Sequence, residues 1–437
     1  NTTGGQNTAI GYQALIANTA SDNTATGFNA LYTNTTGALN LANGWRALYY
    51  NTTGANNTAV GFKSLYSNTT GSESCAVGYR ALSTQTGVGE VNNALGGDAL
   101  RLTTTGQANN AMGHSALENN TTASYNTAMG HRSMTSNSTG ATNTAIGAYA
   151  LQANTTASEN TAVGEQALSA NTTGSGNCGL GRQALNNNTT ASNNTGMGLY
   201  ALYANSTGSD NTAFGKSALL ANTTAGSNAA FGANTLKACT TGEANASFGA
   251  YASFSNTTGT CNTILGFQSG YYITNGSGNI VVGSQTHAGQ YSPVFGIVGE
   301  DNRIVMGTTT VTNAYVKVAW TVTSDQRDKA DITDFTHGLD YINELRPVNY
   351  VWDERSNYAD GISDGSKKKD LPQLGFLAQE IEAVETSLGI TNNCVVDKED
   401  VDSLKITETK LIPILVNAIQ ELSAKNDALE TQNATFA

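Results

Sequence analysis

Apolar and polar positions recur along the first 290 residues with a fixed period. A motif of the form Asn-Thr-Ala-x-Gly, followed by two variable residues and then Ala-Leu, returns in each period. Sixteen steps separate Gly11 from Gly283, which makes 17 residues a step. The motif glycines are Gly11, Gly27, Gly44, Gly61, Gly78, Gly96, Gly113, Gly130, Gly147, Gly164, Gly181, Gly198, Gly215, Gly232, Gly249, Gly266 and Gly283. Such regularity is typical of a stacked repeat.

A unit of 17 residues is too short for two helices and a turn. It predicts two short strands joined by turns, which would form one coil of a β-solenoid. We therefore expect a mainly β fold, with a repeat shaft over residues 1–290. The turns often read Asn-Thr-Thr-Gly, as at Asn51, Asn68 and Asn171. Asn and Gly tolerate left-handed backbone, and stacked Asn side chains can form a hydrogen-bonded ladder.

Two apolar columns supply the predicted core of the solenoid. One column is the residue directly before each glycine, which includes Ile10, Val60, Val77, Leu95, Met112, Ile146, Val163, Met197, Phe214, Phe231 and Leu265. The other is the residue four after it, which includes Leu15, Leu31, Leu48, Leu65, Leu82, Leu100, Leu117, Leu151, Leu168, Leu185, Leu202, Leu219 and Leu236. Two apolar residues a rung make a thin core, which favours further burial between chains.

The period slips after Gly283. Residues 303–307 echo the motif 24 residues later, and residues 315–321 alternate like a strand, so we interpret 291–323 as a capping and connecting segment. Residues 324–437 mix helical and strand patterns and predict an α+β domain. From about residue 404 a final helix places apolar residues at steps of four and three, typical of a coiled-coil seam. The seam would be Leu411, Leu415, Ala418, Leu422, Lys425 and Leu429.

Charge is distributed unevenly between these parts. Residues 1–323 hold ten Lys/Arg and eleven Asp/Glu, and residues 324–437 hold eleven and twenty-two, so the net charge of −12 divides into −1 and −11. No part is basic enough to bind a phosphate backbone, and no run is apolar enough for membrane insertion. The few, scattered acids of residues 1–300 also argue against a polysaccharide hydrolase, which needs clustered carboxylates.

The stretch Ser324-Asp325-Gln326-Arg327-Asp328-Lys329 carries candidate chemistry. A serine becomes a nucleophile when a base takes its proton, and a lysine can be that base if its pKa is lowered. The six residues alone equally fit a helix cap at Ser324 and a solvated ion pair at Lys329.

From Ser324 onward the chain resembles the intramolecular chaperone auto-processing domain at the C-terminus of phage tail fibres, tailspikes and endosialidases. The matching blocks are Ser324-Asp325-x-Arg327-x-Lys329, Gly338-Leu339-Asp340-Tyr341-Ile342 with Leu345-Arg346-Pro347-Val348-Asn349-Tyr350, Gly375-Phe376-Leu377-Ala378-Gln379-Glu380, and Lys410-Leu411-Ile412-Pro413 with Ala418-Ile419-Gln420-Glu421-Leu422. The resemblance implies a domain that trimerises the chain, assists its folding and cuts itself off beside Ser324. It further implies that Ser324 is the nucleophile and Lys329 its base, with Asp325 and Arg327 as supporting motif residues.

The 17-residue repeat is similar to the head repeats of trimeric autotransporter adhesins. In those repeats a small-x-Ala-apolar-Gly motif winds a parallel β-roll that is stable only as a trimer. This likeness agrees with the trimeric expectation from residues 324–437, and together they imply a parallel homotrimer.

Other candidate sites lie in the column directly after the motif glycine. His114 and His131 are expected to stack there, but no cysteine or carboxylate spacing completes a site, so no metal and no cofactor are expected. The first five repeats carry aromatic residues in this column, namely Tyr12, Phe28, Trp45, Phe62 and Tyr79. This stripe could stack on sugars, or it could pack within or between chains, which is the interpretation that we favour.

The five cysteines are odd in number and scattered through the sequence. They indicate free thiols from synthesis in a reducing cytoplasm and no disulfide framework. They are Cys75, Cys178, Cys239, Cys261 and Cys394.

These observations favour a structural and adhesive homotrimeric viral fibre of the phage tail. It would be made in the host cytoplasm, be part of the virion, act outside the cell, and bind a host cell-surface receptor, with a glycan among the candidates. The C-terminal domain would be a single-turnover serine endopeptidase that acts on its own chain. The alternative is a cell-surface trimeric adhesin that retains the domain only to trimerise. An ice-binding solenoid is disfavoured because its threonine column is interrupted at Leu41, Cys75, Asn93 and Asn110.

Overall fold

The computed structural model describes residues 3–87, 91–284, 296–308, 311, 314–315, 317, 322–355, 358, 361–391, 394–398 and 404–436. The chain forms two compact units, residues 1–313 and 314–437. The strand expected at residues 315–321 falls mostly outside the described residues.

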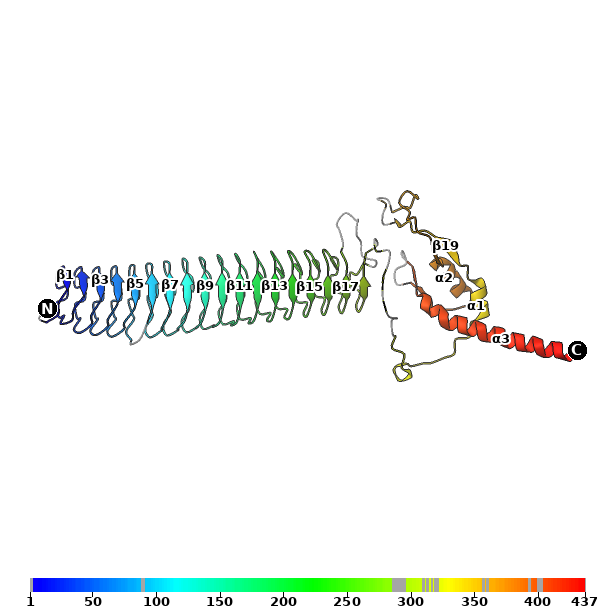
Figure 1. Cartoon of the computed structure of the whole chain (residues 1–437), viewed down its shortest axis with the longest axis horizontal. Coiled ribbons are helices and arrows are strands. Elements are labelled where there is room, and N and C mark those ends of the chain that lie inside the picture. The colour runs from blue at the N-terminus through cyan, green and yellow to red at the C-terminus, as the bar shows by residue number, and fades with distance from the viewer. Residues whose placement is uncertain are drawn as a thin grey trace. The chain divides into compact units, whose positions relative to one another are not determined.

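The first unit is a parallel β-solenoid, as predicted (Figure 1). Each strand pairs in register with the strand one rung further on, for example Thr127 with Thr144 and Met129 with Ile146. The echo of the motif at residues 303–307 adds the last strand, in which Ile304 pairs with Ile280. The strands are β1 (Thr8–Ile10), β2 (Thr24–Thr26), β3 (Leu41–Asn43), β4 (Thr58–Val60), β5 (Cys75–Val77), β6 (Asn93–Leu95), β7 (Asn110–Met112), β8 (Thr127–Met129), β9 (Thr144–Ile146), β10 (Thr161–Val163), β11 (Cys178–Leu180), β12 (Thr195–Met197), β13 (Thr212–Phe214), β14 (Ala229–Phe231), β15 (Ala246–Phe248), β16 (Thr263–Leu265), β17 (Ile280–Val282) and β18 (Ile304–Met306).

Each rung contains one short strand, whereas two were expected. The opposite side of the rung is a series of turns, in which the second and fourth residues after the glycine are left-handed, as at Lys63 (φ 54°) and Leu65 (φ 49°). Left-handed residues interrupt an extended strand. The turns nevertheless bond to the next rung, since the Leu65 N–H donates to the Ala81 carbonyl at 3.1 Å or less, as printed 3.0 Å.

The solenoid core corrects one of the two predicted columns. The leucine column is buried, as predicted, and Leu31, Leu65 and Leu117 are each 0% exposed. The residue before the glycine instead points outward, and Met112 is 47% exposed. In a three-residue strand the side chains alternate, so only the middle residue can face inward, and that residue is usually alanine. The interior is therefore filled by small alanines of the strand and leucines of the turn.

The motif glycine is required by both backbone and space. Gly113 has φ +136°, and a Cβ added there would lie 2.5 Å from the carbonyl oxygen of Gly130 in the next rung. Other residues would strain the backbone and collide with the neighbouring rung. This explains why the glycine marks the period so faithfully.

Two ladders of buried asparagine run through the solenoid. In the corner ladder, formed by the Asn of the Asn-Thr-Thr-Gly turns, Asn68 donates to the Asn51 side-chain oxygen at 2.8 Å and to the Gly71 carbonyl at 2.9 Å. The sequence predicted this ladder. A second ladder, which it did not predict, is formed by the Asn directly before each strand, as where the Asn143 backbone N–H donates to the Asn126 side chain at 3.0 Å. Both ladders satisfy corner amides that would otherwise be buried without partners.

The second unit is a small α+β domain with a long terminal helix. Its elements are η1 (Gln326–Asp328), α1 (Leu339–Glu344), β19 (Val348–Tyr350), β20 (Gln373–Gly375), α2 (Ala378–Ser387), β21 (Val396–Asp397), β22 (Lys405–Ile406), η3 (Glu408–Lys410) and α3 (Leu411–Phe436). β19 pairs antiparallel with β20, and β21 with β22. The core is formed by Tyr341, Ile381, Val384, Val395, Val396, Leu411 and Ile414.

The terminal helix α3 does not present the expected seam. Leu411 and Ala418 are buried, at 6% and 5% exposed, in the domain's own packing. The exposed apolar seam is displaced by one position at these points and comprises Ile412, Leu415, Ile419, Leu422 and Leu429. A periodicity search cannot separate two neighbouring helix faces that are both apolar, and only the packing of the first turns on the domain distinguishes them.

Candidate functional site

The hexapeptide 324–329 folds as a tight turn at the surface. Asp325 caps η1: its carboxylate accepts a hydrogen bond from the backbone N–H of Arg327 at 2.9 Å and an ion pair from the Arg327 guanidinium at 2.6 Å. At the other end, the Lys329 N–H donates to the Gln326 carbonyl at 3.1 Å. The turn brings the two ends of the hexapeptide together.

The Asp325–Arg327 pair orients this turn. The Arg327 side chain, followed by its backbone N–H, lowers the pKa of the Asp325 carboxyl, and Asp325 in turn raises the pKa of Arg327. An ion pair this open to solvent adds little stability. Its effect is geometric, because one carboxylate holds both the backbone and the side chain of Arg327. This gives the two motif residues Asp325 and Arg327 a structural explanation.

Ser324 and Lys329 meet as a result of this turn. The Lys329 ammonium Nζ donates to Ser324 Oγ at 2.6 Å, which is within the range for proton transfer. A lysine accepts a proton only in its neutral form, which burial or nearby positive charge favours. Both side chains are exposed in the single chain. The pair thus has the distance of a nucleophile and its base, and lacks the enclosure that would activate it.

The blocks that carry the family resemblance pack against one another. Gly338 lies directly before α1, where an added Cβ would come within 2.8 Å of the Ala418 nitrogen on α3. This close approach lets the Leu339 N–H donate to the Glu421 carboxylate at 3.0 Å. Asn417 also donates to the carbonyl of Phe335. Residues some 80 positions apart in sequence thereby lock the start of α1 to α3.

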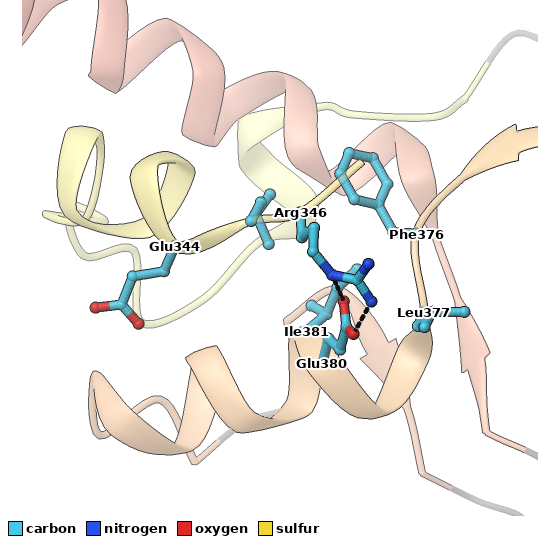
Figure 2. A pocket seen from close by; sticks show the side chains of 7 residues that line it. Glu344, Arg346, Phe376, Leu377, Glu380 and Ile381 are labelled. Carbon is cyan, nitrogen blue, oxygen red and sulfur yellow. Dashed lines mark hydrogen bonds and ion pairs between the residues drawn. The ribbon is translucent and has the colours of Figure 1, made fainter. Parts of the chain in front are cut away.

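A second contact joins the other two blocks (Figure 2). The Arg346 guanidinium pairs with the Glu380 carboxylate at the start of α2, and Phe376, Leu377 and Ile381 line the pocket around the pair. The pocket has room for about one water molecule, so it is no substrate site. The sequence identified Arg346 and Glu380 as motif residues without a role. The structure shows that they hold the β19 side of the domain to α2.

Glu385 is a buried carboxylate that the sequence analysis missed. It is 0% exposed on α2, and its Oε1 accepts hydrogen bonds from the Val395 N–H at 2.7 Å and the Tyr341 hydroxyl at 3.3 Å. Burial, followed by the charge of Glu385, raises the pKa of Tyr341. A glutamate in a helical pattern ordinarily indicates a solvated face, so no sequence signal marked it.

The remaining candidates lie on the solenoid. His114 and His131 stack with ring centroids 5.6 Å apart, as expected. Among the described residues, no group of three or more His, Cys, Asp or Glu side chains could hold a metal ion. The aromatic column from Tyr12 to Tyr79 forms a continuous stack. No helix in the described parts of the chain has the length and apolar character needed to cross a bilayer.

Comparison with known proteins places the C-terminal unit in a class. Residues 324–390 match the model of the Peptidase_S74 family, described as the chaperone of endosialidase. The chain therefore carries an intramolecular chaperone domain of this family, which in general is a self-cleaving peptidase domain. A β-solenoid followed by such a domain fits a phage tail fibre or an endosialidase-like protein. No curated protein and no solved structure matches the chain.

Proposed function

We propose that this chain is the shaft and the C-terminal chaperone of a homotrimeric viral tail fibre, which attaches the particle to a host cell. The observation that carries the proposal is the match of residues 324–390 to a chaperone family directly after an 18-stranded solenoid. The domain would trimerise and fold the shaft, and would then be released by cleavage beside Ser324. The fibre would be assembled in the host cytoplasm and act outside the cell as part of the virion.

The outward face of the sheet supports association between copies. None of the first and third residues in strands β1–β18 is charged. Many of them are apolar and exposed in the single chain, such as Ile10 (60%), Leu265 (51%) and Ile304 (68%). Exposed apolar area of this extent marks a contact surface. We expect this face, called the sheet face below, to pack between copies of the chain.

Helix α3 supports association at the other end of the chain. The steps from Ile412 to Leu415, Ile419 and Leu422 are three, four and three, which places isoleucine at heptad position a and leucine at d. Asn426 occupies the next a position. Isoleucine at a and leucine at d also suits two strands, so the number three is carried by the family resemblance and the solenoid, and the helix contributes affinity and register.

Cleavage would use Ser324 and Lys329. Neutral Lys329 would accept the Ser324 hydroxyl proton as Oγ bonds to an adjacent peptide carbonyl carbon. The carbonyl carbon–nitrogen bond would then break, the proton would pass to the leaving amine, and water would hydrolyse the ester. Because both side chains are exposed in the single chain, we infer that assembly supplies the burial that favours neutral lysine. Cutting would thereby depend on correct folding, and the finished shaft would be trapped kinetically.

The test is the intact mass of the purified chain beside its Ser324→Ala and Lys329→Ala variants, with light scattering for the oligomeric state. We expect trimers, and loss of residues 324–437 or nearly so from the parent alone. Lys317→Ala and Ser363→Ala, which alter the same residue types elsewhere, should cut like the parent. Two fragments from Ser324→Ala would contradict the mechanism.

Uncut trimers in all samples would favour the alternative, a cell-surface trimeric adhesin that retains the domain. The specific observation behind this alternative is that Ser324 and Lys329 are exposed to solvent, where a lysine is a poor base. A monomer would contradict both proposals.

A further inference from the structure

The first five rungs carry a surface unlike the rest of the solenoid. Five aromatic rings, Tyr12, Phe28, Trp45, Phe62 and Tyr79, follow the motif glycines of successive rungs and stack nearly parallel. A second column of Tyr32, Tyr49 and Tyr66 stacks beside them, with centroids 5.1 and 5.4 Å apart. We call these two columns the aromatic strip. At about 4.8 Å a rung it is roughly 20 Å long.

The rings of the aromatic strip keep part of their faces open. The centroids in the first column lie 4.8 to 6.2 Å apart, which exceeds the contact distance of about 3.5–4 Å between carbon atoms. Successive rings are therefore offset, and each leaves a step of exposed carbon. Tyr12 is 64% exposed and Tyr79 51% exposed, in agreement with this geometry. Stepped aromatic surface of this kind suits the apolar C–H faces of sugar rings, with tyrosine hydroxyls available for hydrogen bonds.

Two cations lie between the two columns. The Arg46 guanidinium is 4.3 Å from the Trp45 ring and 5.2 Å from the Tyr49 ring, and Lys63 Nζ is 5.0 Å from the Tyr66 ring. In the described chain neither side chain forms an ion pair with a carboxylate, and Arg46 Nε has no hydrogen-bond partner there. Further along the solenoid, Arg80 pairs with Asp98 at 2.9 Å and Arg101 with Glu118 at 2.7 Å. Arg46 and Lys63 thus remain available to an anion.

The charge on the aromatic strip decides between possible occupants. Copies of the chain packed through this strip would bring like charges together, whereas the sheet face has none. A nucleic acid has one charge per nucleotide, and two cations over some 20 Å neutralise too few of them. A polysaccharide with occasional carboxylates offers both the sugar faces and the sparse negative charge.

We propose that the aromatic strip binds an acidic polysaccharide, with sugar rings on the offset aromatic steps and carboxylates at Arg46 and Lys63. The proposal rests on the proposed role in host attachment, for which it names the ligand class and the binding surface. It also assigns the exposed aromatic stripe a function in addition to its packing along the rod.

The experiment measures binding of the full chain to immobilised polygalacturonate and hyaluronan, with dextran and galactan as neutral polysaccharides and oligo(dT) as a nucleic acid. We expect the two carboxylated polymers to bind in preference and to weaken with salt. Lys63→Gln and Trp45→Ala should each weaken binding about tenfold, from a lost charge-assisted contact and a lost stacking surface. Lys237→Gln and Phe267→Ala, an equivalent cation and an exposed ring in distant rungs, should bind like the parent.

Three outcomes would overturn the proposal: no preference for the carboxylated polymers, tighter binding of oligo(dT), or loss of assembly in Trp45→Ala and Lys63→Gln. The last would make the strip an interface between copies. Oligomeric state and intact mass are measured on the same samples. A parent that assembles and cuts but binds no acidic polymer would therefore contradict this inference alone, while failure to assemble would contradict the proposed function.

Discussion

At the scale of single residues, the solenoid depends on polar side chains that repeat as exactly as its leucines. Each corner asparagine donates to the carbonyl of its own turn and to the asparagine of the preceding rung. At position 239 a cysteine takes this place, and its Sγ contacts only the Gly242 carbonyl, at 3.2 Å. The side-chain oxygen of Asn222 in the rung before is consequently buried without a partner.

Restoring the ladder at this position should stabilise the solenoid. In Cys239→Asn the new amide can donate to both Asn222 and Gly242, and we expect a gain of about 1 kcal/mol in the free energy of unfolding. Denaturant unfolding followed by circular dichroism measures it. Cys239→Ala is the control, since it removes the thiol without supplying a donor, and should not stabilise. An equal gain in both variants would contradict the role of the ladder.

At the scale of elements, the three-residue strand and the terminal helix each have two faces with different tasks. In the strand, alanine fits the narrow interior, and larger apolar residues occupy the sheet face. In α3, Leu411 and Ile414 pack into the domain, while Ile419 (65%) and Leu422 (58%) stay exposed. Apolar character alone therefore marks both a core and a surface for association.

A charge on the exposed seam of α3 should weaken assembly. Ile419→Asp places a carboxylate at an a position, where burial between helices would be costly. We expect dissociation at about tenfold or higher chain concentration than for the parent, measured by sedimentation. Ala424→Asp adds the same charge at the outer position f and should assemble normally. If both variants assemble alike, α3 is not an association helix.

At the scale of the whole molecule, the native cysteines report on assembly. Cys75 and Cys178 are the first residues of β5 and β11, so they lie on the sheet face, half-buried in the single chain. Cys261 is exposed elsewhere on the solenoid, and Cys239 is buried in the interior. Burial raises the pKa of Cys239 to about 11, which further suppresses its reactivity.

Thiol labelling with a maleimide, read out by peptide mass, should distinguish these positions. In the assembled fibre we expect Cys75 and Cys178 to react at least about tenfold more slowly than Cys261, because neighbouring copies cover them. In denaturant all the cysteines should react at similar rates. Labelling of Cys75 as fast as that of Cys261 in the assembled protein would show that the sheet face is open, and would place the interface elsewhere.

The sequence predicted the solenoid, its period and the leucine column correctly, because a stacked repeat imposes its spacing on every rung. It also brought forward Ser324 and Lys329, whose side chains the structure places in contact. It was wrong about the column before the glycine, about the second strand and about part of the helix seam. In each case the pattern showed that residues were apolar, and could not show which side they faced.

By itself, the sequence determined the architecture of a repeat, because glycine, alanine and asparagine at fixed spacing leave the backbone one way to stack. It also determined the uneven charge of the two parts. Only the tertiary structure decided which apolar residues are buried, since that depends on left-handed turns such as those at Lys63 and Leu65. It likewise decided that Arg346 meets Glu380 and that Leu339 meets Glu421, because such contacts depend on how distant segments fold back on each other.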